Sequence, residues 1–206
     1  MIYEYVFPDN MSWNPHTPRN FSTSLLRVHP TFYLEAKETL WNRTCFEFHG
    51  PGGTIDALDS LGPSPSQFIT NIVIRMTYED FDNPLFPRAI SIINSQARHG
   101  KLQSVVLELT FTDIQEIIPK VWGEKYRKQD FNLYDRLRLM SSAQAWRCHR
   151  AIKIEGCESY EELRSQVGGT YHLKAIMYVV EKLHWAWGGS FYLGNMMVWE
   201  NGHRRD

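Results

Sequence analysis

Four short apolar runs, separated by segments of helical periodicity, constrain the fold of this 206-residue chain more than any other feature. The runs occupy residues 45–49, 69–76, 103–111 and 150–155. Between them, apolar side chains recur at every third or fourth position, most clearly over residues 87–99 and 131–146. Strands that alternate with helices are typical of a parallel sheet built from crossover connections. The sequence therefore predicts an α/β fold with a mainly parallel sheet of about four strands, covered by helices mainly on one face.

The remaining segments indicate turns and further helices. The sequence HGPGGT, residues 49–54, predicts a loop, after which Thr54 caps a short helix that Gly62 ends. Residues 191–199 are strand-like, and additional helices are expected at residues 22–27, 30–41, 160–166 and 171–185. We expect a single domain, with a helical start over residues 1–42 and an α/β body over residues 43–206. No tight repeat of about 30 residues is visible, which favours a compact domain over a solenoid.

Composition and motifs exclude several classes of protein. The formal net charge of −1 gives no global attraction to nucleic acid or to a membrane. The opening MIYEYVFPDN has neither the basic start nor the apolar core of a signal peptide, and no apolar run approaches the length of a membrane span. Three cysteines without a CxxC pair favour a reducing compartment, so a cytoplasmic location is expected. Without zinc-type or dinucleotide motifs, no metal and no cofactor are expected.

Each apolar run carries a charged residue, and these charges define the main candidate site. They are Glu47, Arg75, Glu108 and Lys153, with Glu155 closing the last run. In one interpretation the helices cover only one face of the sheet, and the charges face water and pair laterally as Glu–Arg–Glu–Lys. In the other, the charges lie near the carboxyl ends of parallel strands, where open α/β sheets bind ligands.

The second interpretation assigns a chemistry to the carboxylates. Glu47, Glu108 and Glu155 would form a substrate-binding pocket for a guanidinium or ammonium group, with Arg75 as the internal counter-ion. Three carboxylates in one crevice would raise at least one carboxyl pKa. Glu108 and Glu155 are therefore candidate catalytic proton carriers.

Two other segments hold candidate functional residues. The segment from Lys120 to Lys153 is locally basic with interleaved aromatics, which could hold phosphates and stack bases, or could be an amphipathic helix whose aromatics face the core. Its candidate nucleic-acid-binding residues are Lys125, Arg127, Lys128, Arg136, Arg138 and Arg147. Glu181 and His184 are three positions apart on a predicted helix, as a catalytic acid–base pair or a structural contact would be. Trp185 beside them is a candidate substrate-binding residue.

The first quarter of the chain resembles a group of fungal F-box-like proteins. The resemblance is carried by MIYEYVFP and by LLRVHPTFYLEAKETLWNRTCFEFHG behind it; the later strands match that group only in their rhythm. The resemblance implies a fungal source and an interaction module with an F-box-like helical start. In such proteins the first helix and the leucine–proline segment before it contact a Skp1-type adaptor. If Met1 is the native start, this chain begins inside that phrase, and His29-Pro30 replaces the usual cysteine-arginine, so we expect no Skp1 docking.

Two functional hypotheses follow. The leading one is a binding module derived from F-box-like proteins, with a protein or a cationic small molecule as its partner. The second is a metal-independent, amide-forming enzyme of fungal secondary metabolism that uses aminoacyl-tRNA, similar in kind to the synthases of arginine-containing cyclodipeptides, although no motif aligns with them. Acidic strand-end residues would then hold a cationic substrate group, and the basic segment would hold tRNA.

Overall fold

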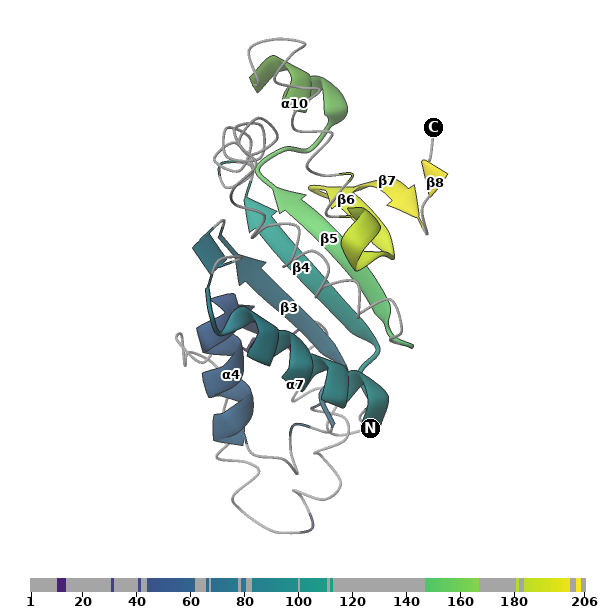
Figure 1. Cartoon of the computed structure of the whole chain (residues 1–206). Helices are drawn as coiled ribbons and strands as arrows, with labels where there is room; N and C mark the ends of the chain where they lie inside the picture. The colour runs from purple at the N-terminus through teal and green to yellow at the C-terminus, as the bar shows by residue number, and fades with distance from the viewer. Residues whose placement is uncertain are drawn as a thin grey trace.

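A single mixed sheet runs through the part of the chain that the structure describes (Figure 1). The computed structural model describes residues 11–13, 31, 41, 44–61, 66, 68–77, 79–80, 83–99, 101–110, 112, 147–166, 181, 184–200 and 203–204. Its strands are β1 (Met11–Trp13), β2 (Thr44–His49), β3 (Asn71–Met76), β4 (Ser104–Thr110), β5 (His149–Glu155), β6 (Ser190–Leu193), β7 (Met196–Glu200) and β8 (His203–Arg204). They lie side by side in sequence order, parallel from β1 to β6 and antiparallel from β6 to β8. The predicted α/β class is confirmed.

The predicted number of about four strands is too low, because the additional strands are short. β1 has three residues and β8 has two, which is too few for an apolar period to be visible. Residues 191–199, predicted as one strand-like segment, instead contribute to the hairpin of β6 and β7, which turns at Gly194 and Asn195. Gly194 has φ 52, a conformation that favours glycine. The Gly-Asn pair inside the run was the signal for this turn.

Three helices are described in full: α4 (Gly50–Leu61), α7 (Phe86–His99) and α10 (Tyr160–Gln166). Figure 1 shows α4 and α7 side by side in front of the sheet, and α10 beyond the end of β5. The bounds of β3, β4, β5, α7 and α10 differ from the predicted ones by at most a residue or two. The predicted helices at 22–27 and 131–146, and most of those at 30–41 and 171–185, lie outside the described residues.

The hydrophobic core fills the space between the sheet and its helices. Alternate residues of the strands point into it, including Phe46 and Phe48 of β2 and Leu107 of β4, while the residues between them are less buried. Ile93 of α7 and Trp187, in the helical turn just before β6, reach the same core, and both are fully buried. The Trp187 indole Nε1 donates a hydrogen bond to the backbone oxygen of Ala151, 3.1 Å away, which satisfies its polar group.

The strand order has a consequence for where a ligand can bind. Crossovers of one hand that always lead to the next strand return on the same side of the sheet, as α4 and α7 do. In doubly wound sheets the ligand crevice forms where the strand order reverses. From β1 to β6 the order never reverses. A binding site on this part of the sheet therefore cannot be the crevice of a topological switch point and must be formed by other segments at the strand ends.

The junction between β2 and α4 differs from the prediction. HGPGGT is not a loop, because α4 begins at Gly50, directly after β2. Gly50 has φ 63, which turns the chain out of the strand, and Pro51 suits the first helical turn, where a missing N–H costs nothing. Thr54 lies inside the helix, where its Oγ1 donates to the backbone oxygen of Gly50 at 2.7 Å, so it is not the helix cap. The start of α4 thus lies at the carboxyl end of the sheet.

Candidate functional site

The charged strand residues gather near the carboxyl ends of neighbouring strands. Strand register places Arg75, Glu108 and Lys153 side by side on β3, β4 and β5. Glu47 of β2 pairs with Val73, which is two residues before Arg75 on β3, and His49 pairs with Arg75. Because side chains alternate along a strand, this row lies on the face of the sheet opposite to the core-facing residues.

Ion pairs connect most of these residues. Arg75 Nε lies 2.6 Å from Glu108 Oε2, and Arg75 Nη2 lies 3.3 Å from Glu47 Oε2. Lys153 forms its ion pair with Glu155, two positions along its own strand. The expected lateral order Glu–Arg–Glu is therefore present, but the last lateral pair, Glu108 with Lys153, is replaced by Lys153 with Glu155. A side chain two residues along the strand is on the same face and competes directly with a lateral partner.

The two carboxyl groups of Glu108 and Glu155 have opposite environments. Burial raises the pKa of Glu108, whose side chain is only 13% exposed; Arg75 lowers it, and a hydrogen bond with Glu155 raises it further. A hydrogen bond from Lys153 lowers the pKa of Glu155. Because the pKa of Glu108 is raised and that of Glu155 is lowered, Glu108 is the carboxyl of the pair that binds a proton more readily. Such a pair can hold and release one proton.

A pocket of about 780 Å³ lies where these strands end. Its lining residues include His49, Arg75, Asp80, Glu108, Thr110 and Glu155. Glu47 does not line it, but reaches it through its ion pair with Arg75. Three of the predicted charged residues, Arg75, Glu108 and Glu155, thus share one cavity.

Asp80 is a pocket residue that the sequence analysis did not single out. Its Oδ2 accepts hydrogen bonds from the Thr77 backbone N–H at 2.8 Å and from the Thr77 hydroxyl at 3.0 Å. Its Oδ1 lies against Gly50, where an added Cβ would come within 2.6 Å. The signal was available, because the sequence TYED follows directly after β3 and supplies acidic residues at a strand end.

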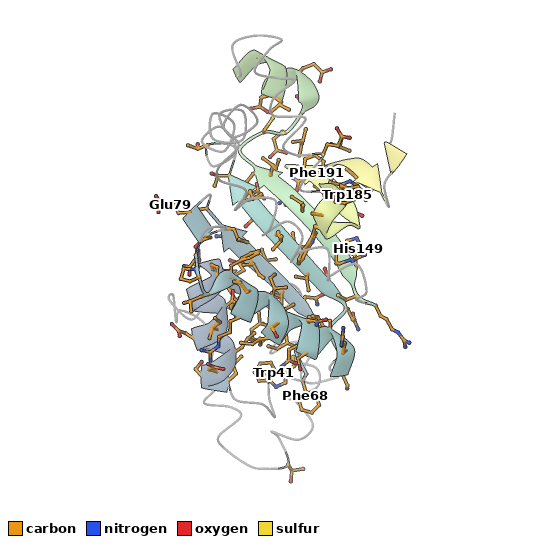
Figure 2. The ribbon with its side chains drawn as sticks, in the orientation of Figure 1. Trp41, Phe68, Glu79, His149, Trp185 and Phe191 are labelled. Atoms are coloured by element: carbon orange, nitrogen blue, oxygen red, sulfur yellow. The ribbon has the colours of Figure 1, made fainter. Side chains whose placement is uncertain are left out.

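The other predicted catalytic residues lie away from the pocket. His184 is buried, and its Nε2 lies 3.0 Å from the backbone oxygen of Gly189. Trp185 is 73% exposed, and Glu181 is also exposed. Figure 2 shows Trp185 with Phe191 near β6, whereas Glu79 lies beyond the end of β3 on the pocket side. The structure does not bring Glu181, His184 or Trp185 to the pocket lining.

The predicted nucleic-acid-binding residues are almost all beyond what the structure describes. Arg147 is exposed and lies just before β5, at the amino end of the sheet and so opposite to the pocket. The remaining candidates lie outside the described residues: Lys125, Arg127, Lys128, Arg136 and Arg138. Their predicted role stays a prediction.

One contact of a chemically active type was missed by the sequence analysis. His149 Nε2 lies 3.2 Å from Ser190 Oγ, on the neighbouring strands β5 and β6. Ser190 is only 3% exposed and no pocket residue adjoins it along its strand, so the contact ties two strands together rather than presenting a nucleophile. Cys45 is equally unsuited to nucleophilic attack, because burial, with Glu47 and Glu108 nearby, raises the pKa of its thiol to about 11.

The described residues show neither a metal-binding group nor a membrane-spanning helix. In the described ranges, no group of three His, Cys, Asp or Glu side chains is placed to hold a metal ion, and no helix there has the length and apolar character to cross a bilayer. Comparisons of the chain with protein-family models, with curated proteins and with solved structures found no match.

Proposed function

We propose that this chain is a binding module whose pocket, at the carboxyl ends of β2 to β5, recognises a cationic group of a protein partner or a small molecule. One observation carries the proposal: carboxylates from separate strands converge on a pocket of about 780 Å³ whose wall also includes the half-exposed guanidinium of Arg75. A volume of this size falls within the roughly 300–1,000 Å³ of small-ligand sites.

The charge balance of the pocket favours a cation. Among the described residues, four carboxyl groups lie in or beside it, those of Glu47, Asp80, Glu108 and Glu155, against the two cationic side chains of Arg75 and Lys153. An incoming ammonium or guanidinium group relieves the repulsion between the carboxylates. Hydrogen bonds between charged partners contribute about 1.5–3 kcal/mol each, more than neutral ones.

Calorimetric titration with hexylamine tests the proposal, with 1-hexanol as the uncharged analogue of equal length. We expect hexylamine to bind and hexanol not to bind under the same conditions. Glu155→Gln should weaken the binding of hexylamine, whereas Glu161→Gln, at an exposed position on α10, should leave it unchanged. Equal binding of the two compounds, or equal effects of the two variants, would contradict a cation site in this pocket.

We further propose that this binding role derives from F-box-like interaction proteins and does not include Skp1 docking. The support is the resemblance of the first quarter of the chain, followed by a helix–strand series, together with the altered His29-Pro30 phrase. Size-exclusion chromatography of the protein mixed with Skp1 tests it. Separate elution is expected, and stoichiometric co-elution would contradict the loss of docking.

The pocket would equally suit the cationic substrate group of an enzyme that uses aminoacyl-tRNA, so the second hypothesis stays open. It differs in requiring nucleic acid. If it holds, the purified protein carries nucleic acid that raises its 260/280 nm absorbance ratio and that is lost when salt is raised. A ratio typical of protein alone, at low salt, would favour the binding module. Expression in a heterologous host, followed by a search of the medium for new arginine-containing compounds, tests the activity itself.

A further inference from the structure

We propose that the ligand of this pocket is a zwitterion, with an anionic group bound to the Nη1 side of Arg75 and a cationic group bound at the Glu108–Glu155 carboxyl pair. The inference rests on the proposed function and narrows its ligand class. A small molecule with separated charges, such as an amino acid with a basic side chain, has this chemistry.

Arg75 has donors to spare. A guanidinium carries five N–H groups, and the ion pairs of Arg75 involve Nε, with Glu108, and Nη2, with Glu47. Neither ion pair engages Nη1. The side chain is 48% exposed and lines the pocket, so a ligand can reach it. A carboxylate is the natural acceptor for the planar guanidinium edge.

The cationic group has its acceptors on the next strands. Glu108 is directly beside Arg75 in the strand register, and Glu155 lies one strand further, on β5. Adjacent strands are about 4.8 Å apart, so the charges of the ligand would be separated by roughly 5–10 Å. That separation matches a basic side-chain group and an α-carboxylate better than the adjacent charges of glycine.

The two halves are compatible because they lie on different strands. Arg75 presents Nη1 from β3, whereas a hydrogen bond from Lys153 lowers the pKa of Glu155 and so favours a carboxylate on β5 for the cation. The charged and titratable groups that face Glu108 are Arg75 from β3, Lys153 and Glu155 from β5, and Cys45 and Glu47 from β2; His49 and Asp80 add to the pocket wall. A purely anionic ligand would meet an excess of carboxylates, and a purely cationic one would make no use of the Nη1 donors of Arg75.

Three compounds with the same six-carbon chain distinguish a zwitterion site from a cation site and an anion site. They are 6-aminohexanoate, which has both charges, hexylamine, which has the cation alone, and hexanoate, which has the anion alone. Calorimetric titration at pH 7 should give about tenfold tighter binding for 6-aminohexanoate than for hexylamine, and no binding of hexanoate. Arg75→Gln should remove this preference. Arg75→Lys keeps a cation between Glu47 and Glu108 but lacks Nη1, and should reduce the preference to a few-fold.

Arg88→Gln is the matched control, because Arg88 is an exposed arginine that also forms an ion pair, with Asp59, but does not line the pocket. It should leave the preference intact. Equal affinity for 6-aminohexanoate and hexylamine would overturn this inference and leave the cation site standing. A preference that survives Arg75→Gln in a variant with an unchanged melting temperature would also overturn it. If hexylamine does not bind at all, the proposed function falls with it.

Discussion

The two faces of the sheet are made from alternate residues of the same strands, yet they follow different rules. On the helix-covered face, Phe48, Ile74 and Leu107 are almost completely buried. A polar side chain placed there would lose its hydrogen bonds to water, which costs folding free energy. On the other face, Glu47, Arg75 and Glu108 keep part of their exposure and form a chain of ion pairs. The first face holds the fold together, whereas the second carries charged side chains that line or adjoin the pocket.

Two adjacent residues of β2 point to opposite faces of the sheet and so allow a direct test of this difference. Phe48→Ala should lower the free energy of unfolding by about 3–5 kcal/mol, because it leaves a cavity in the core. Glu47→Gln should cost no more than about 1 kcal/mol, because its ion pair is partly exposed. Urea unfolding at pH 7 measures both. Similar losses would show that the two faces contribute equally to stability.

The glycines at the start of α4 provide the next largest effect. Gly50→Ala should destabilise the protein by about 1–3 kcal/mol, because φ 63 disfavours a side chain and the new Cβ would collide with Asp80. Gly52→Ala is the control: its Cβ would meet only Leu85 Cδ1 at an ordinary 3.7 Å. Thermal melting compares them, and hexylamine titration of Gly50→Ala should show weakened binding as Asp80 is displaced. Equal melting temperatures for both variants would contradict the tight β2–α4 junction.

Cation binding should depend on pH, because the Glu108 side chain of the pocket is mostly buried. Since burial raises the pKa of Glu108, this group is neutral at pH values where an ordinary glutamate is already ionised. Hexylamine binding should therefore strengthen severalfold as pH rises through the raised pKa, and Glu108→Gln should remove that dependence. Titrations from pH 4.5 to pH 8 measure it. A pH-independent affinity in the unmodified protein would exclude Glu108 as the coupled group.

The smallest effect concerns ion pairs themselves. A double-mutant cycle on Arg88 and Asp59, both more than half exposed, should give a coupling energy of about 0.2–0.5 kcal/mol. The cycle on Arg75 and Glu108 should give a larger value, because Glu108 is mostly buried and the two atoms are 2.6 Å apart. Unfolding in urea provides both cycles. Equal coupling would mean that the pocket pair is no different from a surface pair.

The pattern of apolar residues was sufficient to predict the strands and helices whose positions are set by burial in the core. Alternation in β3 and β4 and the helical period of α7 each follow from which residues must be buried, and their predicted bounds agree with the structure. The β2–α4 junction was missed because Gly-Pro-Gly-Gly favours a loop locally, while the packed helix overrides that preference. The hairpin of β6 and β7 was missed because its turn is only two residues long.

The candidate site was partly predictable for the same reason. Arg75 and Glu108 occupy equivalent positions in successive strands, so their proximity could be predicted. Lys153 pairs with Glu155 instead of the expected Glu108, and this choice depends on side-chain competition that the sequence pattern does not show. Asp80 joins the pocket through a turn stabilised by Thr77 and through the space left by Gly50, which are both tertiary features.

Carboxyl ¹³C chemical shifts of Glu108 and Glu155, followed during a titration with hexylamine at fixed pH, report whether a cation binds at this carboxyl pair. A cation held at this carboxyl pair should drive the proton from Glu108, so its resonance moves toward the ionised position and that of Glu155 also shifts. The exposed carboxyl of Glu161, on α10 and not in the pocket lining, should stay in place. Shifts of equal size at all three groups, or none at Glu108, would contradict a cation site at the end of this sheet.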